Sequence, residues 1–192
     1  MTWQHPFNKR TITSKFGETA RRTTPHRGTD YAPGANKLIP AVTSGTVKKI
    51  AWSNCLGWYM VQTGWADGKT WYVGYHHLSC KTHGIDCKGP KVDGCTTPFV
   101  RLKVGDELKI GKPAGRVGNS GDCSRGAHLH ITIGRSLNAG VSGTVYDIEK
   151  FIDEQLQKNS TRNKATSAFT RKKKGTEKAA VKVCPTCKQE VK

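Results

Sequence analysis

The stretch that decides the fold is residues 126–134, GAHLHITIG. Its apolar and polar residues alternate between bounding glycines, a pattern that predicts a β-strand. Residues two apart in a strand project from the same face, about 7 Å from each other. His128 and His130 are therefore expected to point into one site, while Leu129 packs on the opposite face.

Short runs of the same kind fill most of the first 145 residues, and Gly, Pro, Asn and Asp separate them. The clearest are residues 45–52 (GTVKKIAW), 57–64 (GWYMVQTG), 69–77 (KTWYVGYHH) and 108–111. Asp67 and Gly68 between the second and third run are a strong hairpin signal. This pattern predicts a mainly β protein built from antiparallel strands.

One segment, residues 145–157 (VYDIEKFIDEQLQ), has helical periodicity. Ile148, Phe151, Ile152 and Gln155 fall on one side of it, as expected for a helix that closes the domain. We therefore predict a folded domain over residues 1–157. Residues 158–192 form a polar, basic segment with the composition of a disordered linker, and it ends in a Cys-x-x-Cys knuckle, Cys184 and Cys187.

The length of 192 residues supports one domain and an appendage. No run approaches the roughly 18 apolar residues that a membrane-spanning helix needs, so no transmembrane segment is expected. The first ten residues, MTWQHPFNKR, lack the features of a secretory signal. From this we expect synthesis in the cytoplasm without a signal peptide.

The formal net charge of +18 is divided unevenly along the chain. Residues 158–192 carry 11 Lys or Arg and 2 acidic residues, and residues 1–157 carry 21 and 12, so each part has a net charge of +9. The shorter tail is several times more basic per residue. It is either a solvated tail or a tether to a polyanion such as nucleic acid, an anionic wall polymer or a membrane surface.

The seven cysteines cannot all pair within the chain. In a reducing cytosol, clustered cysteines more often bind metal than form disulfides. Cys80, His83, Cys87 and Cys95 lie in one Gly- and Lys-rich stretch, with Cys123 as a fifth candidate. They could hold a second, structural metal or form one or two disulfides.

A second group of potential ligands lies in residues 25–33, PHRGTDYAP. In an extended chain His26 and Asp30 would be about 13 Å apart, too far to share an ion. Gly28 between them supplies a bend that could bring them together. With one imidazole of the His128 and His130 pair, they make three N and O ligands and leave a fourth tetrahedral position for water, as in a catalytic zinc site.

At this point the sequence resembles the lysostaphin-like zinc endopeptidases of peptidoglycan, the M23 family. The resemblance covers residues 12–133 in family order, with Ala127 in place of the usual Pro and a cysteine-bearing insertion after Ser79. The motifs are TSKFG (13–17), HRGTDYAP (26–33), PAVTSGTV (40–47), YHHLS (75–79), KVGDELKIGKPAGRVGNSG (103–121) and GAHLHITI (126–133).

The resemblance implies a two-sheet antiparallel β fold with a catalytic groove, and His26, Asp30 and His130 as ligands of one catalytic Zn²⁺. It implies that His128 and His77 are catalytic, one as general base and one as a partner of the oxyanion, in an order that the sequence leaves open. His76 would face the other side of a regular strand and is expected to be structural.

The implied function is hydrolysis of peptide bonds in bacterial peptidoglycan. Compact size and the expected cytoplasmic synthesis resemble a bacteriophage endolysin that reaches the wall through a holin. A virion-associated wall hydrolase and a non-enzymatic peptidoglycan-binding relative are the alternatives. The basic tail would bind anionic wall polymers, and no stable nucleic-acid partner is expected, because Phe169 is the only aromatic residue of the tail.

Overall fold

The computed structural model describes residues 2–20, 22–80, 87, 98 and 101–177. The contacts between residues divide the chain into two units, Met1–Leu156 and Gln157–Lys192. Among the described residues, no helix combines the length and the apolar character needed to cross a membrane.

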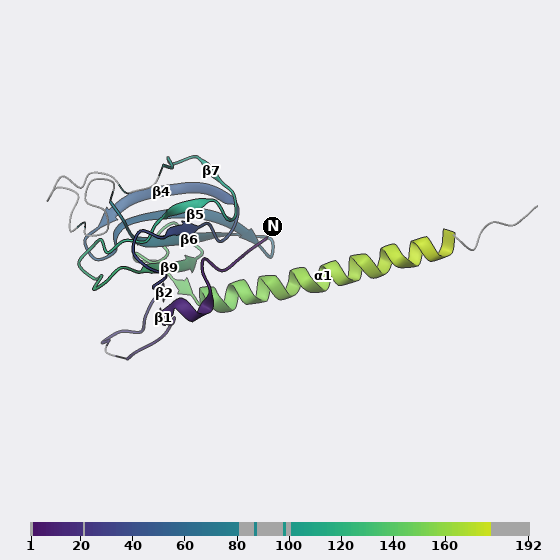
Figure 1. Ribbon diagram of the computed structural model, residues 1–192, viewed down its shortest axis with the longest axis horizontal. Helices are drawn as coiled ribbons and strands as arrows, with labels where there is room; N and C mark the ends of the chain where they lie inside the picture. The colour runs from purple at the N-terminus through teal and green to yellow at the C-terminus, as the bar shows by residue number, and fades with distance from the viewer. Residues whose placement is uncertain (1, 21, 81–86, 88–97, 99–100, 178–192) are drawn as a thin grey trace, which may run out of the picture. The chain divides into compact units, whose positions relative to one another are not determined.

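Eight strands form one antiparallel sheet in the first unit (Figure 1). Their order is β1-β2-β9-β6-β5-β4-β7, and β10 pairs with the end of β9. These strands are β1 (Ile12–Ser14), β2 (Thr29–Tyr31), β4 (Gly45–Ser53), β5 (Gly57–Ala66), β6 (Lys69–Leu78), β7 (Glu107–Leu108), β9 (Leu129–Gly134) and β10 (Val145–Tyr146). A separate pair consists of β3 (Leu38–Pro40) and β8 (Pro113–Arg116), and a short 3-10 helix, η1 (Lys9–Thr11), precedes β1.

Strand β9 lies between β2 and β6 and alternates as its sequence predicts. Leu129, Ile131 and Ile133 are fully buried in the apolar core. His130 and Thr132 occupy the alternate positions and are also buried, because the strand has neighbours on both faces. Apolar side chains from β3, β8 and the start of the helix complete the core, among them Ile39, Ala114, Ile148 and Ile152.

The predicted hairpin between residues 57–64 and 69–77 is confirmed. Strands β5 and β6 pair along their length, and only Asp67 and Gly68 connect them. Both residues have positive φ, 51° and 71°, which is the conformation of a two-residue type I′ turn. The expected strand at 108–111 is shorter than predicted, because β7 covers only Glu107–Leu108.

The predicted helix is present as α1 (Ile148–Glu177). It begins later than expected because residues 145–146 form β10 and the Asp147 side chain accepts hydrogen bonds from the backbone N–H groups of Glu149 and Lys150. Ile148, Phe151, Ile152 and Gln155 are buried, as predicted.

The structure differs from the predicted linker over residues 158–177, which continue α1. No proline and no glycine before Gly175 interrupts this stretch, and its Lys, Arg and Ala residues are good helix formers. The Cys184 and Cys187 knuckle lies outside the described residues.

The cysteines do not support the second metal site. Cys55 and Cys123 form a disulfide with a Cα–Cα distance of 4.7 Å, so Cys123 does not join a thiolate cluster. Cys80 and Cys87 are also disulfide-bonded and cannot act as thiolate ligands. His83 and Cys95, the other two members of that predicted site, lie outside the described residues.

A charged cluster joins the N-terminal segment to α1. His5 Nδ1 lies 3.0 Å from Glu149 Oε1, and His5 Nε2 lies 3.0 Å from Asp153 Oδ1. Lys9 Nζ donates to Asp153 Oδ2 at 2.6 Å, and the Tyr31 hydroxyl donates to Glu149. The hydrogen bond to Glu149 raises the pKa of His5, although partial burial opposes the shift. Both ring nitrogens can donate to carboxylates only when His5 is protonated.

We predict that His5→Gln destabilises the protein at acidic pH and has little effect at alkaline pH. A raised pKa in the folded state means that the stabilisation is fully present below the unfolded pKa of about 6.5 and is lost as pH rises through the folded pKa. The expected loss is about 1 kcal/mol at pH 5.5, in the range of partly exposed ion pairs. Urea unfolding of both proteins at pH 5.5 and 9 measures it, and a difference independent of pH would contradict the protonated His5 bridge.

Candidate metal centre

The pairing of β2 with β9 places Asp30 directly opposite His130. Directly opposed residues of antiparallel strands project from the same face. Asp30 Oδ1 therefore lies 2.8 Å from His130 Nδ1. Both side chains are almost completely buried, with 7% of each residue exposed.

His26 reaches the same point from the loop that precedes β2. Its Nε2 lies 3.0 Å from His130 Nδ1 and 3.2 Å from Asp30 Oδ1. Gly28 permits this through close packing, not through an unusual backbone angle. A Cβ atom at residue 28 would lie 2.5 Å from the carbonyl oxygen of Ile131 and 2.6 Å from the ring of His130.

The other nitrogen of His26 fixes the orientation of its ring. Nδ1 lies 3.0 Å from the Lys15 carbonyl oxygen and 3.0 Å from Ser14 Oγ. A proton on Nδ1 bonded to these oxygens leaves the lone pair on Nε2 directed at Asp30 and His130. Such outer hydrogen bonds are typical of histidines that bind a metal.

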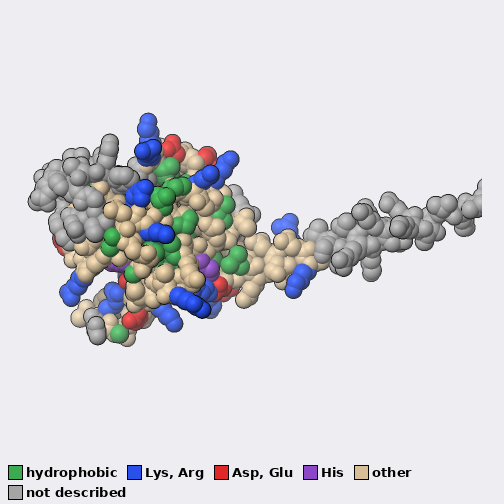
Figure 2. Space-filling view, in the orientation of Figure 1, with side chains coloured by type: hydrophobic (Ala, Val, Ile, Leu, Met, Phe, Trp, Pro, Cys, Tyr) green, Lys and Arg blue, Asp and Glu red, His purple; other side chains and the backbone are tan. Residues whose placement is uncertain are grey.

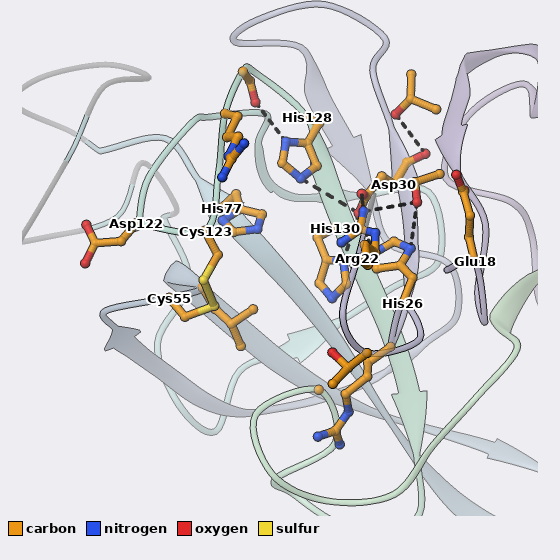
Figure 3. Close-up of a pocket in the computed structure, with 18 of the residues that line it drawn as sticks. Glu18, Arg22, His26, Asp30, Cys55, His77, Asp122, Cys123, His128 and His130 are labelled. Carbon is orange, nitrogen blue, oxygen red and sulfur yellow. Dashed lines mark hydrogen bonds and ion pairs between the residues drawn. A yellow bond between two sulfur atoms is a disulfide. The ribbon is translucent and has the colours of Figure 1, made fainter. Parts of the chain in front are cut away.

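The three atoms fit a zinc ion in chemistry and spacing (Figure 3). Two imidazole nitrogens and one carboxylate oxygen are a common ligand set of catalytic zinc. A tetrahedral site with bonds of about 2.1 Å has edges of about 3.4 Å, and the separations here are 2.8, 3.0 and 3.2 Å. The structure thus brings together His26, Asp30 and His130, the three ligands that the sequence predicts.

The protonation states also favour a cation. Burial would raise the pKa of Asp30, but its interactions with His130 and His26 outweigh it and keep this pKa well below its usual range. Burial lowers the pKa of His130, and Asp30 only partly offsets this. At neutral pH the site therefore offers an ionised carboxylate and a neutral imidazole, which are the metal-binding forms.

His128 and His77 lie beside the three ligands, and Figure 3 shows both rings on the groove side. His128 Nδ1 lies 2.8 Å from the Gly126 carbonyl oxygen, and its Nε2 lies 3.8 Å from Asp30 Oδ1. His77 Nδ1 lies 2.8 Å from the Ser120 carbonyl oxygen, and its ring centroid lies 4.7 Å from that of His128. In both residues Nδ1 carries the proton, so Nε2 presents a lone pair.

A β-bulge in β6 sets the position of His77. The register shifts between Trp58 and Met60 of β5, so His76 and His77 together oppose Tyr59. His77 adopts a left-handed conformation with φ of 58°, unusual for a residue other than glycine. Burial, with the neighbouring His128 and His130, lowers the pKa of His77 to about 3.

The bulge corrects the prediction that His76 faces away from the site. His76 pairs with His130, and their ring centroids lie 5.2 Å apart. The residue is fully buried, its Nε2 lies 3.0 Å from Thr132 Oγ1, and Nδ1 has no hydrogen-bond partner. His76 therefore lies on the same face of the sheet as His130. It packs behind that residue and does not line the groove.

An open pocket gives access to the cluster. Residues of the β1–β2 connection line one side, and residues 122–123 and 125–128 with Ser53, Cys55 and Leu56 line the other. The Cys55–Cys123 disulfide is part of this second wall (Figure 3). Sequence reasoning missed the groups that orient the histidines, namely Ser14, Ser120 and Gly126, because backbone carbonyls and single serines leave no spacing signal.

No family model matches the chain. Its structure is similar to LytU, with 26% identity and a TM-score of 0.57 over 80% of this chain and 91% of LytU. The catalytic domain of the prophage-encoded M23 protein EnpA from Enterococcus faecalis matches with 26% identity and a TM-score of 0.54, over 73% and 91%. The catalytic domain of the antimicrobial peptidase lysostaphin from Staphylococcus simulans matches with 22% identity and a TM-score of 0.55, over 74% and 91%.

The chain spans 36% of a longer zinc-containing peptidase from Vibrio cholerae, with 23% identity and a TM-score of 0.51 over 69% of this chain. Peptidases are thus among the similar structures, and some of these are M23 proteins. The chain has the mainly antiparallel β fold of the lysostaphin-like M23 peptidases, as its sequence motifs predict.

We predict that His26→Ala, Asp30→Ala and His130→Ala each lose bound zinc, because two remaining ligands hold the ion weakly. Metal analysis of the purified variants after dialysis measures this directly. Retention of a full equivalent of zinc by His130→Ala, together with its loss from His128→Ala, would reverse the assignment of the two histidines.

We predict that His128→Ala and His77→Ala keep zinc and stay folded but lose about 10²-fold or more in turnover, the usual size of a lost acid-base or oxyanion group. The measurements are metal content, circular dichroism and the rate of wall hydrolysis. His76→Gln is the matched control, because it changes a histidine that lies behind the ligands. Near-normal hydrolysis by His77→Ala would show that His77 takes no part in the reaction.

Proposed function

We propose that the chain is an M23-family zinc endopeptidase that hydrolyses peptide bonds in bacterial peptidoglycan. The observation that carries this is the convergence of His26 Nε2, Asp30 Oδ1 and His130 Nδ1 beside an open pocket, with two further histidines on its rim. The fold shared with peptidases supports the same class of reaction.

Zinc held by the three ligands would supply a Lewis acid and an activated water molecule for hydrolysis. His128 faces this position with the lone pair of Nε2 and takes a proton from the attacking water. The Gly126 carbonyl oxygen accepts a hydrogen bond from His128 Nδ1–H and so stabilises the tautomer that is protonated at Nδ1. The protonated ring can then deliver a proton to the departing amine.

His77 has a more restricted role. Because its Nδ1 proton is committed to Ser120, a neutral His77 accepts at Nε2 and cannot donate. It can donate to a developing oxyanion only as an imidazolium, a form that burial disfavours. The geometry therefore favours His128 as the base, with His77 as a group that becomes a donor only after it receives a proton.

A structural zinc site in a non-enzymatic binding relative is the competing function. Structural sites are commonly closed by four protein ligands, whereas catalytic sites keep a position open. Here three residues converge among the described residues, and the His128 and His77 lone pairs border the open side. This arrangement supports an enzyme.

We further propose that the chain works as a phage-derived wall hydrolase. The prophage-encoded EnpA among the similar structures supports this origin. An endolysin released through a holin is the first form of this proposal, and a virion-associated hydrolase is the second. Timed lysis after expression with and without a holin distinguishes them, because only an endolysin depends on release from the cytoplasm.

The proposed activity is tested by zymography on purified bacterial walls. We expect a clearing zone that disappears with a zinc chelator and returns when zinc is added. Soluble products should carry new amino groups and no new reducing sugar ends, because the bond cleaved is a peptide bond. Wall binding without product release, with or without zinc, would identify a binding protein.

The basic segment 158–192 should attract anionic wall polymers. Lys and Arg are scattered over the visible face of the first unit (Figure 2), whereas this segment carries a net +9 in 35 residues. At 0.15 M salt the screening length is about 8 Å, so attraction through exposed charges weakens as salt rises.

We predict that a chain ending at Lys158 cleaves small soluble muropeptides like the full chain but binds intact walls less well at low salt. The difference should shrink as salt increases. Sedimentation with walls at several salt concentrations measures it. Equal binding by both chains at low salt would show that the charge serves only solubility.

A further inference from the structure

Arg22 is the one arginine side chain that contacts the candidate ligands within the described part of the chain. It comes from the loop between β1 and β2, and 38% of its side chain is exposed in the pocket. Its Nη2 lies 3.4 Å from Asp30 Oδ2 and 3.1 Å from Ser14 Oγ. Nη2 carries two N–H groups, so it can donate to both oxygens at once.

The contact with Arg22 gives the two carboxylate oxygens of Asp30 different partners. Oδ1 faces His26 and His130, at 3.2 and 2.8 Å. Oδ2 faces the guanidinium of Arg22 instead. An oxygen bonded to a guanidinium is held away from a neighbouring metal, so Asp30 would bind through Oδ1 alone. One-oxygen binding preserves three protein ligands and an open position.

The contact with Ser14 reaches a second ligand. Ser14 Oγ accepts from Arg22 and lies 3.0 Å from His26 Nδ1, so the serine links the guanidinium to the outer edge of the His26 ring. Ser14 and Asp30 are paired residues of β1 and β2. With one nitrogen, Arg22 thus contacts the ligand Asp30 in β2 and, through Ser14 in β1, the partner of the ligand His26.

We propose that Arg22 is a positioning residue that restricts Asp30 to one-oxygen coordination and orients His26, and so sets the zinc affinity of the site. This inference rests on the proposed zinc enzyme. It deepens that function by assigning a role to a residue outside the ligand and histidine sets.

Simple electrostatics makes the opposite prediction, which sharpens the test. Arg22 is a positive charge close to a site for a divalent cation, so its removal should strengthen zinc binding if charge alone matters. A positioning role predicts weaker binding, and the loss of an outer partner of a metal ligand usually reduces affinity 10- to 100-fold.

The experiment measures the zinc Kd of the full chain by competition with a chromogenic chelator. Arg22→Gln should bind 10- to 100-fold more weakly, and Arg22→Lys should lie between Arg22→Gln and the unmodified protein, because a lysine has charge but no planar fork. Arg125→Gln removes the same charge from the opposite wall of the pocket and should leave the Kd unchanged or slightly lower.

A second measurement separates positioning from a general loss of structure. Co²⁺ replaces zinc, and its visible absorption reports coordination geometry. In Arg22→Gln the bands should weaken as Asp30 gains a second bond to the metal. Thermal unfolding of the metal-free variants should change little. If Arg22→Gln does not fold, Arg22→Lys carries the same comparison.

Unchanged or tighter zinc binding by a folded Arg22→Gln would overturn the proposal. So would an unchanged Kd and Co²⁺ spectrum with a raised KM for wall peptides, because Arg22 would then bind substrate. The zinc measurement does not need catalysis. If the unmodified protein binds zinc but releases no peptide from walls, the proposed function fails and the role of Arg22 is still decided.

Discussion

Asp30 lies directly opposite His130 in the antiparallel pair of β2 and β9, and the rest of the site is arranged around this contact. A shift of one residue in that register would turn Asp30 to the other face of the sheet. Leu129 and Ile131 prevent the shift, because it would move both from the core. The apolar pattern that places β9 in the sheet therefore also fixes the distance between two ligands.

His76, His77 and His130 stay neutral because they are buried together. The rings of His76, His77 and His26 each have their centroid within 5.9 Å of the His130 centroid. Burial and mutual repulsion lower the pKa of His76, His77 and His130. Neutral imidazoles offer the lone pairs that a metal and a general base require. The same packing leaves His76 Nδ1 without a partner and holds His77 at a positive φ, local costs that are common at functional sites.

Much of the site could be predicted from the sequence, because the patterns that determine it lie within short stretches of the chain. The alternation of His128, Leu129 and His130 predicts which face each side chain occupies, and the structure agrees for Leu129 and His130. The Asp67-Gly68 turn is equally local. Strands β1, β2 and β3 were not predicted, because three residues are too few to show a period of two.

Features that depend on pairing between distant segments could not be predicted. The bulge at His76 and His77 exists only relative to β5, so the sequence alone indicates a regular strand and places His76 on the wrong face. Arg22 gives no signal either, because its importance comes from reaching Ser14 and Asp30 across two strands. Composition also left a second metal site and disulfides as alternatives for the cysteines, and the structure has disulfides at Cys55, Cys123, Cys80 and Cys87.

The Cys55–Cys123 disulfide connects the groove wall to the segment that orients His77. It joins the β4–β5 turn to the loop that contains Ser120, and backbone hydrogen bonds from Asp122 to Asn54 and from Cys123 to Cys55 reinforce it. A link across 68 residues contributes up to about 4 kcal/mol by limiting the unfolded chain. The Ser120 carbonyl oxygen accepts a hydrogen bond from His77 Nδ1. By restraining Ser120, the disulfide therefore also restrains His77, one of the proposed catalytic residues. Disulfides persist in oxidising compartments and are rare in the cytosol. The disulfide that restrains His77 would therefore persist outside the cytosol, where the proposed substrate, the cell wall, is found.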